Sequence, residues 1–203
     1  MPGFEILHED AAVLVVNKPA GMLTQAPLGI DSLEVRIKRL LHEREASDDE
    51  IYLGVPHRLD RPVSGVIVFA KTLKAAQKIS RQFEKRWVEK IYWALVEGSV
   101  EPQAGTWTDH LKKVYGKPRS EVVEVSDPLG QIAILHYQTI QQFADKTLLQ
   151  IQLETGRTHQ IRIQCACRGH PLLGDELYGS GVPFGPWSDD ERERLIALHA
   201  RSL

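Results

Sequence analysis

The stretch that most constrains this chain is a turn with one carboxylate between two arginines, followed by a strand-like run and a helix-like pattern. Asp60 lies between Arg58 and Arg61, and the apolar, largely β-branched residues 66–70 predict a buried strand. Thr72 is expected to cap the helix that follows. Guanidinium groups favour the ionised form of a carboxylate, whether it forms a structural ion pair or acts as a nucleophile. The spacing alone leaves both interpretations open.

The remaining hydrophobic patterns predict a mixed, strand-rich α+β domain with helices on one side. Helices are expected after Asp31, Thr72 and Thr158, and the last of them is expected to end at Gly169. A capping-box pattern at Ser188 predicts a short helix. The strands before it are expected at residues 12–16, 66–70, 91–96 and 105–111, and then as an antiparallel meander at 121–125, 132–140 and 147–153.

Length, cysteine content and the N-terminal sequence limit the class of protein. The 203 residues suffice for one large domain or two small ones, and no run of 18 apolar residues suggests a membrane span. The N-terminus has no signal-peptide pattern, and Cys165 and Cys167 offer no disulfide framework, so reduced thiols in a cytoplasmic protein are expected. His57, His159 and His170 lack close metal-ligand spacing, so no metal site is expected.

The net charge of −2 argues mildly against a nucleic-acid partner, but the basic residues are clustered. One cluster falls between residues 71 and 90, and a second between 112 and 119. Each could form a basic stripe on one face or merely a solvated surface. The members are Lys71, Lys74, Lys78, Arg81, Lys85, Arg86 and Lys90, and then Lys112, Lys113, Lys117 and Arg119.

Two further segments could carry chemistry. In the strand-like segment Lys90–Gly98, alternation places Tyr92 and Trp93 on opposite faces, so only one of them needs to face the core. The segment from Leu153 to Arg162 combines a glycine turn with a donor-rich helix start. Such a start could bind an anion, for example an RNA phosphate, or could simply be capped and solvated.

Several segments, taken in order, resemble the motifs of the RluA family of pseudouridine synthases. The resemblance covers about residues 5–203, and a series of motifs in family order is more specific than any one of them. The segments are Asn17–Gly21, His57–Gly65, Lys90–Gly98, Leu153–Gly179 and the tail Leu198–Ala200.

The resemblance implies a fold and an activity. The fold would be a long, mixed, mostly antiparallel central sheet flanked by helices and loops, with the active-site cleft across its middle. After the short helix expected at Ser188, residues 195–202 would form a strand. Residues 1–203 would form a single catalytic domain without a separate N-terminal RNA-binding domain. The enzyme would be a cytoplasmic monomer that uses no cofactor and no metal, and it would isomerise uridine to pseudouridine in structured rRNA or tRNA.

Family similarity also implies roles for individual residues. Asp60 would be the catalytic residue, attacking the ribose anomeric carbon or abstracting a neighbouring proton. Arg162 would pair with Asp60 and keep it ionised. Tyr92 would stack on the target uracil, Ile161 would line the pocket, and Arg58 would fill the gap left by the flipped nucleotide.

The chain departs from the family pattern at one position of the catalytic motif, and two rival functions remain to be considered. Val63 stands where many members have threonine, which removes one hydroxyl. One rival is a catalytically inactive RNA-binding module on the same fold. The other is a glycoside or nucleoside hydrolase using Asp60, but a second carboxylate in a matching motif is not evident, and hydrolysis ordinarily requires one.

Overall fold

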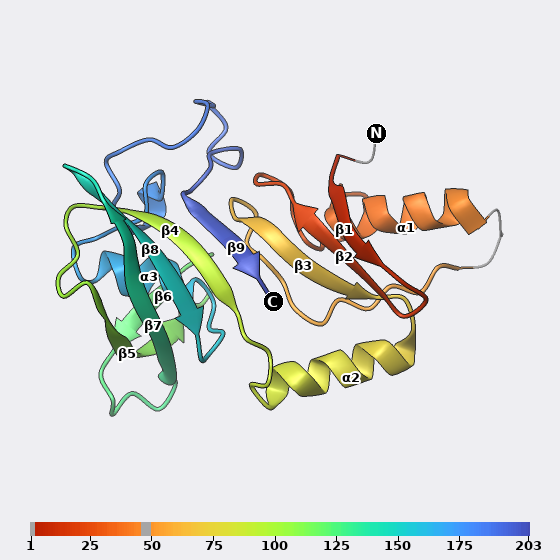
Figure 1. Ribbon diagram of the computed structural model, residues 1–203, viewed down its shortest axis with the longest axis horizontal. Helices are drawn as coiled ribbons and strands as arrows, with labels where there is room; N and C mark the ends of the chain where they lie inside the picture. The colour runs from red at the N-terminus through yellow and green to blue at the C-terminus, as the bar shows by residue number, and fades with distance from the viewer. Residues whose placement is uncertain (1–2, 46–49) are drawn as a thin grey trace. The chain divides into compact units, whose positions relative to one another are not determined.

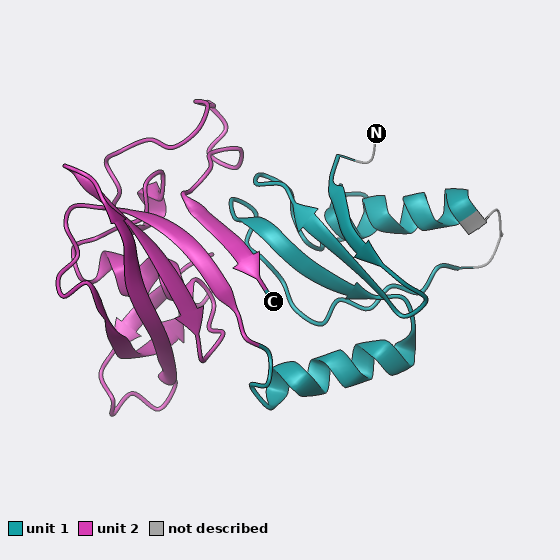
Figure 2. Ribbon diagram, viewed as in Figure 1, with its two compact units in different colours: residues 1–88, 203 teal, residues 89–202 magenta. Residues whose placement is uncertain are grey.

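The computed structural model describes residues 3–45 and 50–203, which fall into two compact units (Figures 1 and 2). Unit 1 comprises residues 1–88 and Leu203, and unit 2 comprises residues 89–202. The described chain contains nine strands and three α-helices, and all strand ladders within each unit are antiparallel. The expected α+β class with mostly antiparallel strands is therefore confirmed. A single catalytic domain stays a prediction.

Three strands form the sheet of unit 1, in the order β1 (Glu5–Glu9), β2 (Val13–Lys18) and β3 (Ser64–Ala70). Leu14 lies opposite Phe69 in the register of β2 and β3. Alternate side chains of β2 are buried, so the strand places Leu14, Val16 and Lys18 on its inner face. A lysine thus occupies a position that the strand period reserves for the core.

Two helices accompany this sheet, α1 (Leu33–Glu45) and α2 (Leu73–Glu84). The Thr72 hydroxyl accepts the Ala75 amide at 3.2 Å, which confirms it as the cap of α2. The helix packs close to the chain at Gly54, where an added Cβ would lie 2.7 Å from that of Ala76. A side chain at Gly54 would therefore push α2 away.

Unit 2 is built on six strands in the order β9, β4, β8, β7, β5 and β6. The core face includes Ala94 of β4, Leu149 and Ile151 of β8, and Leu135 of β7, which are fully buried. Among its described residues, unit 2 has one α-helix, α3 (Gln160–Ala166). A 3-10 turn, η1, spans Glu176–Tyr178. The strand bounds are β4 (Ile91–Glu97), β5 (Ala104–Lys113), β6 (Ser120–Val123), β7 (Gln131–Gln142), β8 (Lys146–Leu153) and β9 (Leu198–Ser202).

The expected meander is wrong in one respect. Strands β7 and β8 form a hairpin as expected, but β6 pairs with β5, and β5 itself pairs with β7. The chain after β5 returns along the outer edge of that strand, which places β5 between β6 and β7. Strand pairing across a sheet depends on which edge remains open, and the period of a strand does not encode that.

Two expected helix caps are also wrong. Ser32 caps α1 by accepting the Val35 amide at 3.3 Å, whereas Asp31 forms an ion pair with Arg36. The N-cap of α3 is His159 in a left-handed conformation, not Thr158, and its side chain makes no capping bond. In both places the N-cap lies one residue later than expected, and only Ser32 caps its helix with a side chain.

The expected helix at Ser188 is absent from the described tail, where residues 189–193 form turns. Ser188 Oγ accepts the Asp190 amide at 3.2 Å, and Asp190 accepts the Arg192 amide at 2.9 Å. These serine and aspartate oxygens bond the backbone two residues ahead, a turn geometry that competes with the helix. The expected strand is confirmed in β9.

Candidate functional site

Asp60 lies on a turn that buried neighbours hold in place. Leu59 and Val63 on either side are buried, and the Val63 amide donates to the Asp60 carbonyl at 3.1 Å. The buried Thr24 hydroxyl donates to the Leu59 carbonyl at 2.9 Å and accepts the Leu59 amide at 3.2 Å. The half-buried carboxylate of Asp60 is therefore carried on a backbone that is fixed from beneath.

Lys18 is the buried cation of this turn. Its fully buried ammonium donates to the carbonyls of Pro19, Met22 and Arg61 at 3.0, 2.7 and 3.2 Å. An ammonium has three N–H donors, and each has an acceptor here. Burial lowers the pKa of Lys18 to about 7, while the negative charge of Asp60 acts to raise this pKa. The lysine thus joins the segment after β2 to the segment after Asp60.

His57 ties the start of the same turn to its surroundings. The Val68 amide donates to His57 Nε2 at 3.1 Å, and the imidazole stacks on Phe83 with ring centroids 4.7 Å apart. These contacts connect the turn with β3 and with α2. Arg58, one residue later, has an exposed side chain.

Tyr92 and Trp93 occupy opposite faces of β4, as the strand period predicts. Tyr92 is 9% exposed and belongs to the core face, whereas Trp93 is 39% exposed. The Arg201 guanidinium lies over the Trp93 ring, 5.2 Å from its centroid. Of these two aromatic residues, Tyr92 is therefore the one that lies on the inner face of unit 2.

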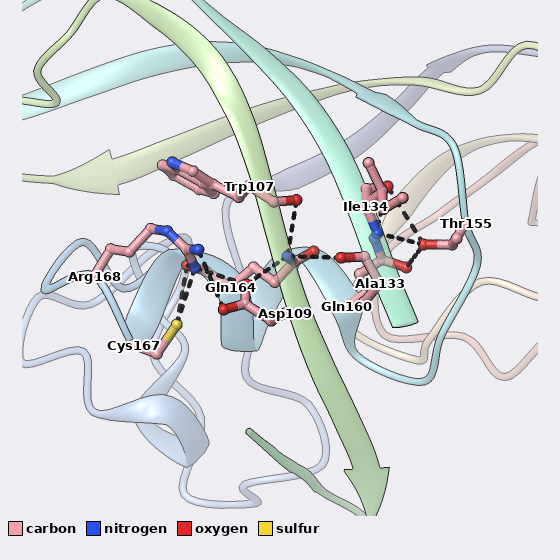
Figure 3. A network of polar contacts seen from close by, with 9 residues as sticks. All are labelled: Trp107, Asp109, Ala133, Ile134, Thr155, Gln160, Gln164, Cys167 and Arg168. Carbon is pink, nitrogen blue, oxygen red and sulfur yellow. Dashed lines mark hydrogen bonds and ion pairs between the residues drawn. The ribbon is translucent and has the colours of Figure 1, made fainter. Parts of the chain in front are cut away.

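The turn before α3 is fixed to β7 by two side chains (Figure 3). Thr155 Oγ1 accepts the Ile134 amide at 2.8 Å and donates to Gln160 Oε1 at 2.8 Å. Gln160 also accepts the Arg157 amide at 3.0 Å and donates to the Ile134 carbonyl at 3.1 Å. The first turn of α3, which carries Ile161 and Arg162, therefore has a defined position on the sheet.

The rest of α3 is bound to the sheet by a second set of polar contacts, also visible in Figure 3. The buried Gln164 amide donates to Asp109 at 2.7 Å and to the carbonyls of Trp107 and Ala133. Arg168 pairs with both carboxylate oxygens of Asp109 at 2.9 and 3.2 Å. Its guanidinium lies 4.8 Å from the Trp107 ring centroid.

Arg162 makes a buried, bidentate ion pair with Asp175. Nε donates to Oδ2 at 2.6 Å and Nη2 donates to Oδ1 at 2.7 Å, and the side chains are 7% and 1% exposed. Paired N–H donors that match two carboxylate oxygens fix both the position and the plane of a guanidinium. Asp175 therefore orients Arg162 within unit 2.

A histidine and a tyrosine complete this network. Arg162 Nη1 lies 3.2 Å from His159 Nε2, and His159 Nδ1 lies 3.0 Å from the Tyr178 hydroxyl. A guanidinium can only donate, so Nε2 is the acceptor in this contact, which leaves Nδ1 to donate to the Tyr178 hydroxyl. Burial raises the pKa of the Tyr178 hydroxyl, which also accepts the Ser120 amide at 2.8 Å.

The sequence-predicted site residues divide between the units. Arg58 and Asp60 belong to unit 1, and Tyr92, Ile161 and Arg162 belong to unit 2. The pairing of Arg162 with Asp60 stays a prediction.

Sequence reasoning assigned no role to Lys18, Thr24, Asp175 or Tyr178. A usable signal existed for Lys18, because it continues the inward phase of Leu14 and Val16. Asp175 and Tyr178 lie in the quoted motif, but their pairing with α3 required the fold.

The donor-rich turn at residues 155–159 is occupied internally. Arg157 Nε donates to the Ile132 carbonyl and Nη1 to Gln131 Oε1, both at 3.0 Å, and its amide bonds Gln160. These contacts favour the capping interpretation over an anion site. Among the described residues, no group of three or more metal-ligating side chains exists, and no helix is long and apolar enough to cross a membrane.

Comparison with known proteins places this geometry in a family. A family model described as RNA pseudouridylate synthase matches residues 12–167. The ribosomal large subunit pseudouridine synthase D of Pseudomonas aeruginosa is 34% identical over 98% of this chain and 62% of its own length. An uncharacterized RNA pseudouridine synthase of Bacillus subtilis, YhcT, is 35% identical over 87% of this chain and 58% of its own length. The chain thus spans about 60% of the length of the curated relatives it matches.

A solved structure supports the same fold. Human RNA pseudouridylate synthase domain containing 4 matches with a TM-score of 0.79 and 26% identity. The match covers 97% of this chain and 82% of the human chain. Nearly every described element of this chain therefore has a counterpart in that structure.

The Thr24 hydroxyl should matter for the stability of the Asp60 turn. Thr24→Val removes both bonds to Leu59 while keeping the shape, and should cost about 1–3 kcal/mol because two buried groups lose their partner. Hydrogen exchange at the Leu59 amide should accelerate. Thr24→Ser keeps the hydroxyl and should retain most of this protection, and equal exchange in the two variants would contradict the assignment.

Lys18 should make stability depend on pH. Because its folded pKa of about 7 is below the ordinary value, the unfolded chain binds more protons between about pH 7 and pH 10. The unfolding free energy of the wild type, relative to Lys18→Met, should therefore rise with pH in this range. The slope should approach about 1.4 kcal/mol per pH unit, measured by denaturant titration. A difference that stays constant from pH 6 to pH 10 would show that Lys18 does not titrate there.

The pairing of Arg162 with Asp175 should appear as a large coupling energy. Arg162→Met and Asp175→Asn should each cost about 3–5 kcal/mol, because each leaves the other member buried and unpaired. The double variant should cost much less than the sum, as measured by urea unfolding. The matched cycle of Arg168→Met with Asp109→Asn concerns a less buried pair, so its coupling should be smaller. Additive effects at Arg162 and Asp175 would refute the pairing.

Proposed function

Because this chain belongs to the RNA pseudouridylate synthase family, we propose that it isomerises uridine to pseudouridine in RNA. The observation that carries the proposal is the fixed turn of Asp60, with buried Leu59, Thr24 and Lys18 beneath a half-buried carboxylate. Relatives named for the large ribosomal subunit support ribosomal RNA as the substrate, with tRNA as the other class that the motifs allow.

The reaction is an isomerisation with no net gain or loss of atoms. The bond between uracil N1 and the ribose anomeric carbon breaks, the base rotates, and carbon 5 bonds to the anomeric carbon. Carbon 5 then loses its proton, and N1 ends with one. A carboxylate suits this chemistry because it can bond to the anomeric carbon or stabilise its positive charge, or accept a neighbouring proton.

The other site residues would bind and orient the nucleotide. Tyr92 would stack on the uracil, a contact worth about 1–3 kcal/mol per base, and Ile161 would supply an apolar wall. Arg58, which is exposed, would take the place of the base that leaves the stack. Arg162, oriented by Asp175, would keep Asp60 ionised. No cofactor, a monomeric state and a cytoplasmic location stay predictions from the sequence.

The presence of all three residues expected to act on the substrate nucleotide argues against an inactive RNA-binding module. Asp60, Tyr92 and Arg162 are all present, and the Asp60 turn and the Arg162 ion pair are each supported by buried contacts. A hydrolase would need a second carboxylate to activate water.

Asp60→Ala and Asp60→Asn should both abolish isomerisation while the protein stays folded and still binds RNA. The measurement is release of a hydrogen label from carbon 5 of uridine in RNA. Asp31→Asn serves as the control, because it removes an exposed carboxylate of the same unit that pairs with Arg36, and it should turn over normally. Near-normal label release in both Asp60 variants would sink the assignment.

A further inference from the structure

Three basic residues of α2 and Lys85, the C-cap residue directly after it, form one straight, exposed stripe. Lys74, Lys78, Arg81 and Lys85 follow one another at intervals of four, three and four residues, and all four are exposed. At 3.6 residues per turn they lie within about 60° of one another around the helix axis, and they span about 16 Å along it. The stripe therefore presents four positive charges in a line.

None of these four side chains makes an ion pair or a hydrogen bond with another side chain in the part of the chain that the structure describes. Three other lysines of the two basic clusters, by contrast, are engaged inside the protein. Lys71 pairs with Glu9 at 3.0 Å, Lys90 donates to the Thr155 carbonyl at 3.4 Å, and Lys112 pairs with Asp127 at 2.9 Å. The stripe thus differs from these three engaged lysines. Lys113, Lys117 and Arg119 are also exposed, but they lie at the end of β5 and in the loop after it and so form no helical line.

The stripe places like charges side by side on the helix surface, although Arg81 and Lys85 at its C-terminal end interact favourably with the helix dipole. Like charges three or four residues apart repel each other and destabilise an isolated helix. Helix α1 of the same unit shows the opposite arrangement, because its Arg36, Lys38 and Arg44 pair with Asp31, Glu34 and Glu9. The basic side chains of the stripe repel one another and have no acidic partner within the described chain. This arrangement points to an anionic partner from outside the chain.

The opposite face of α2 connects the stripe with the Asp60 turn. Phe83 lies on that face and stacks on His57, three residues before Asp60, and Ala76 packs against Gly54. Part of the face that would have to enter a lipid surface is therefore in contact with the rest of unit 1. Interfacial helices need that face free, so the arrangement favours a polyanion that binds to the charged stripe alone.

We propose that Lys74, Lys78, Arg81 and Lys85 form a docking track for the phosphate backbone of the substrate RNA. The proposal rests on the function proposed above and adds a surface to it. The track carries no base-reading group, so it binds without regard to sequence and supplies affinity through counterion release. Its rigid connection through Phe83 and His57 keeps the bound backbone in a fixed relation to the turn of Asp60.

The test is the salt dependence of RNA binding, with the full chain and an unstructured, uridine-containing RNA oligonucleotide. Substitution of all four residues by glutamine keeps helix propensity and removes the repulsion, so the thermal unfolding midpoint should hold or rise. Each phosphate contact on a single strand contributes about 0.7 to the slope of log K against log salt, so the slope should fall by about 3. Affinity near physiological salt should fall on the order of 100-fold.

A matched control separates the track from net charge. In the control variant, glutamine replaces four basic residues of α1, so the net charge changes by the same amount. These residues are Arg36, Lys38, Arg39 and Arg44. This control should keep most of the slope. The proposal is overturned if the α2 variant keeps the wild-type slope, or if the α1 variant loses as much. Equally strong binding of the wild type to anionic phospholipid vesicles, lost in the α2 variant, would also overturn the assignment to RNA.

The wild-type protein tests the underlying function separately. It should form pseudouridine in RNA extracted from cells that lack it, detected by label release from carbon 5. No pseudouridine from the wild type would refute the enzyme and remove the basis for a substrate track. Turnover by the wild type together with an unchanged slope in the α2 variant would refute the track alone.

Discussion

The buried ammonium of Lys18 is the interaction on which unit 1 depends. It donates to the carbonyls of Pro19, Met22 and Arg61, which come from two segments far apart in the sequence. Burial disfavours the charge, and the three carbonyls and the Asp60 carboxylate offset only part of this cost, so the pKa of Lys18 is lowered to about 7. Hydrophobic side chains could fill the same space, but they could not bond three carbonyl oxygens. The lysine thereby fixes the backbone that carries Asp60.

Unit 2 also contains a buried cation, the guanidinium of Arg162, and its main partner is the carboxylate of Asp175. Asp175 accepts hydrogen bonds from two N–H groups of Arg162, and His159 Nε2 accepts a third, so the guanidinium has a defined plane. Thr155 and Gln160 fix the helix start to β7, and Gln164 fixes the middle of the helix to β5 and β7. A seven-residue helix has little stability of its own, so these tertiary bonds position it.

Most positioning groups lie far from the catalytic candidates in the sequence. Thr24 supports Leu59 across 35 residues, and Tyr178 bonds His159 across 19. Such contacts close long loops, and the entropic cost of closure is met only when the surrounding core forms. The state of the basic residues also depends on contacts between distant segments. Glu9 pairs with Lys71 and Asp127 pairs with Lys112, whereas the residues of the α2 stripe stay exposed.

The sequence by itself determined the local elements and the family. Strand and helix periods predicted β2, β3, β4 and α2, because the phase of burial follows from the backbone period alone. The motifs identified Asp60 and the segment that holds Arg162. The tertiary structure alone decided the place of β5 between β6 and β7 and the partners of Lys18 and Arg162. These depend on which edges and donors remain free once the core has formed, and no local pattern encodes that.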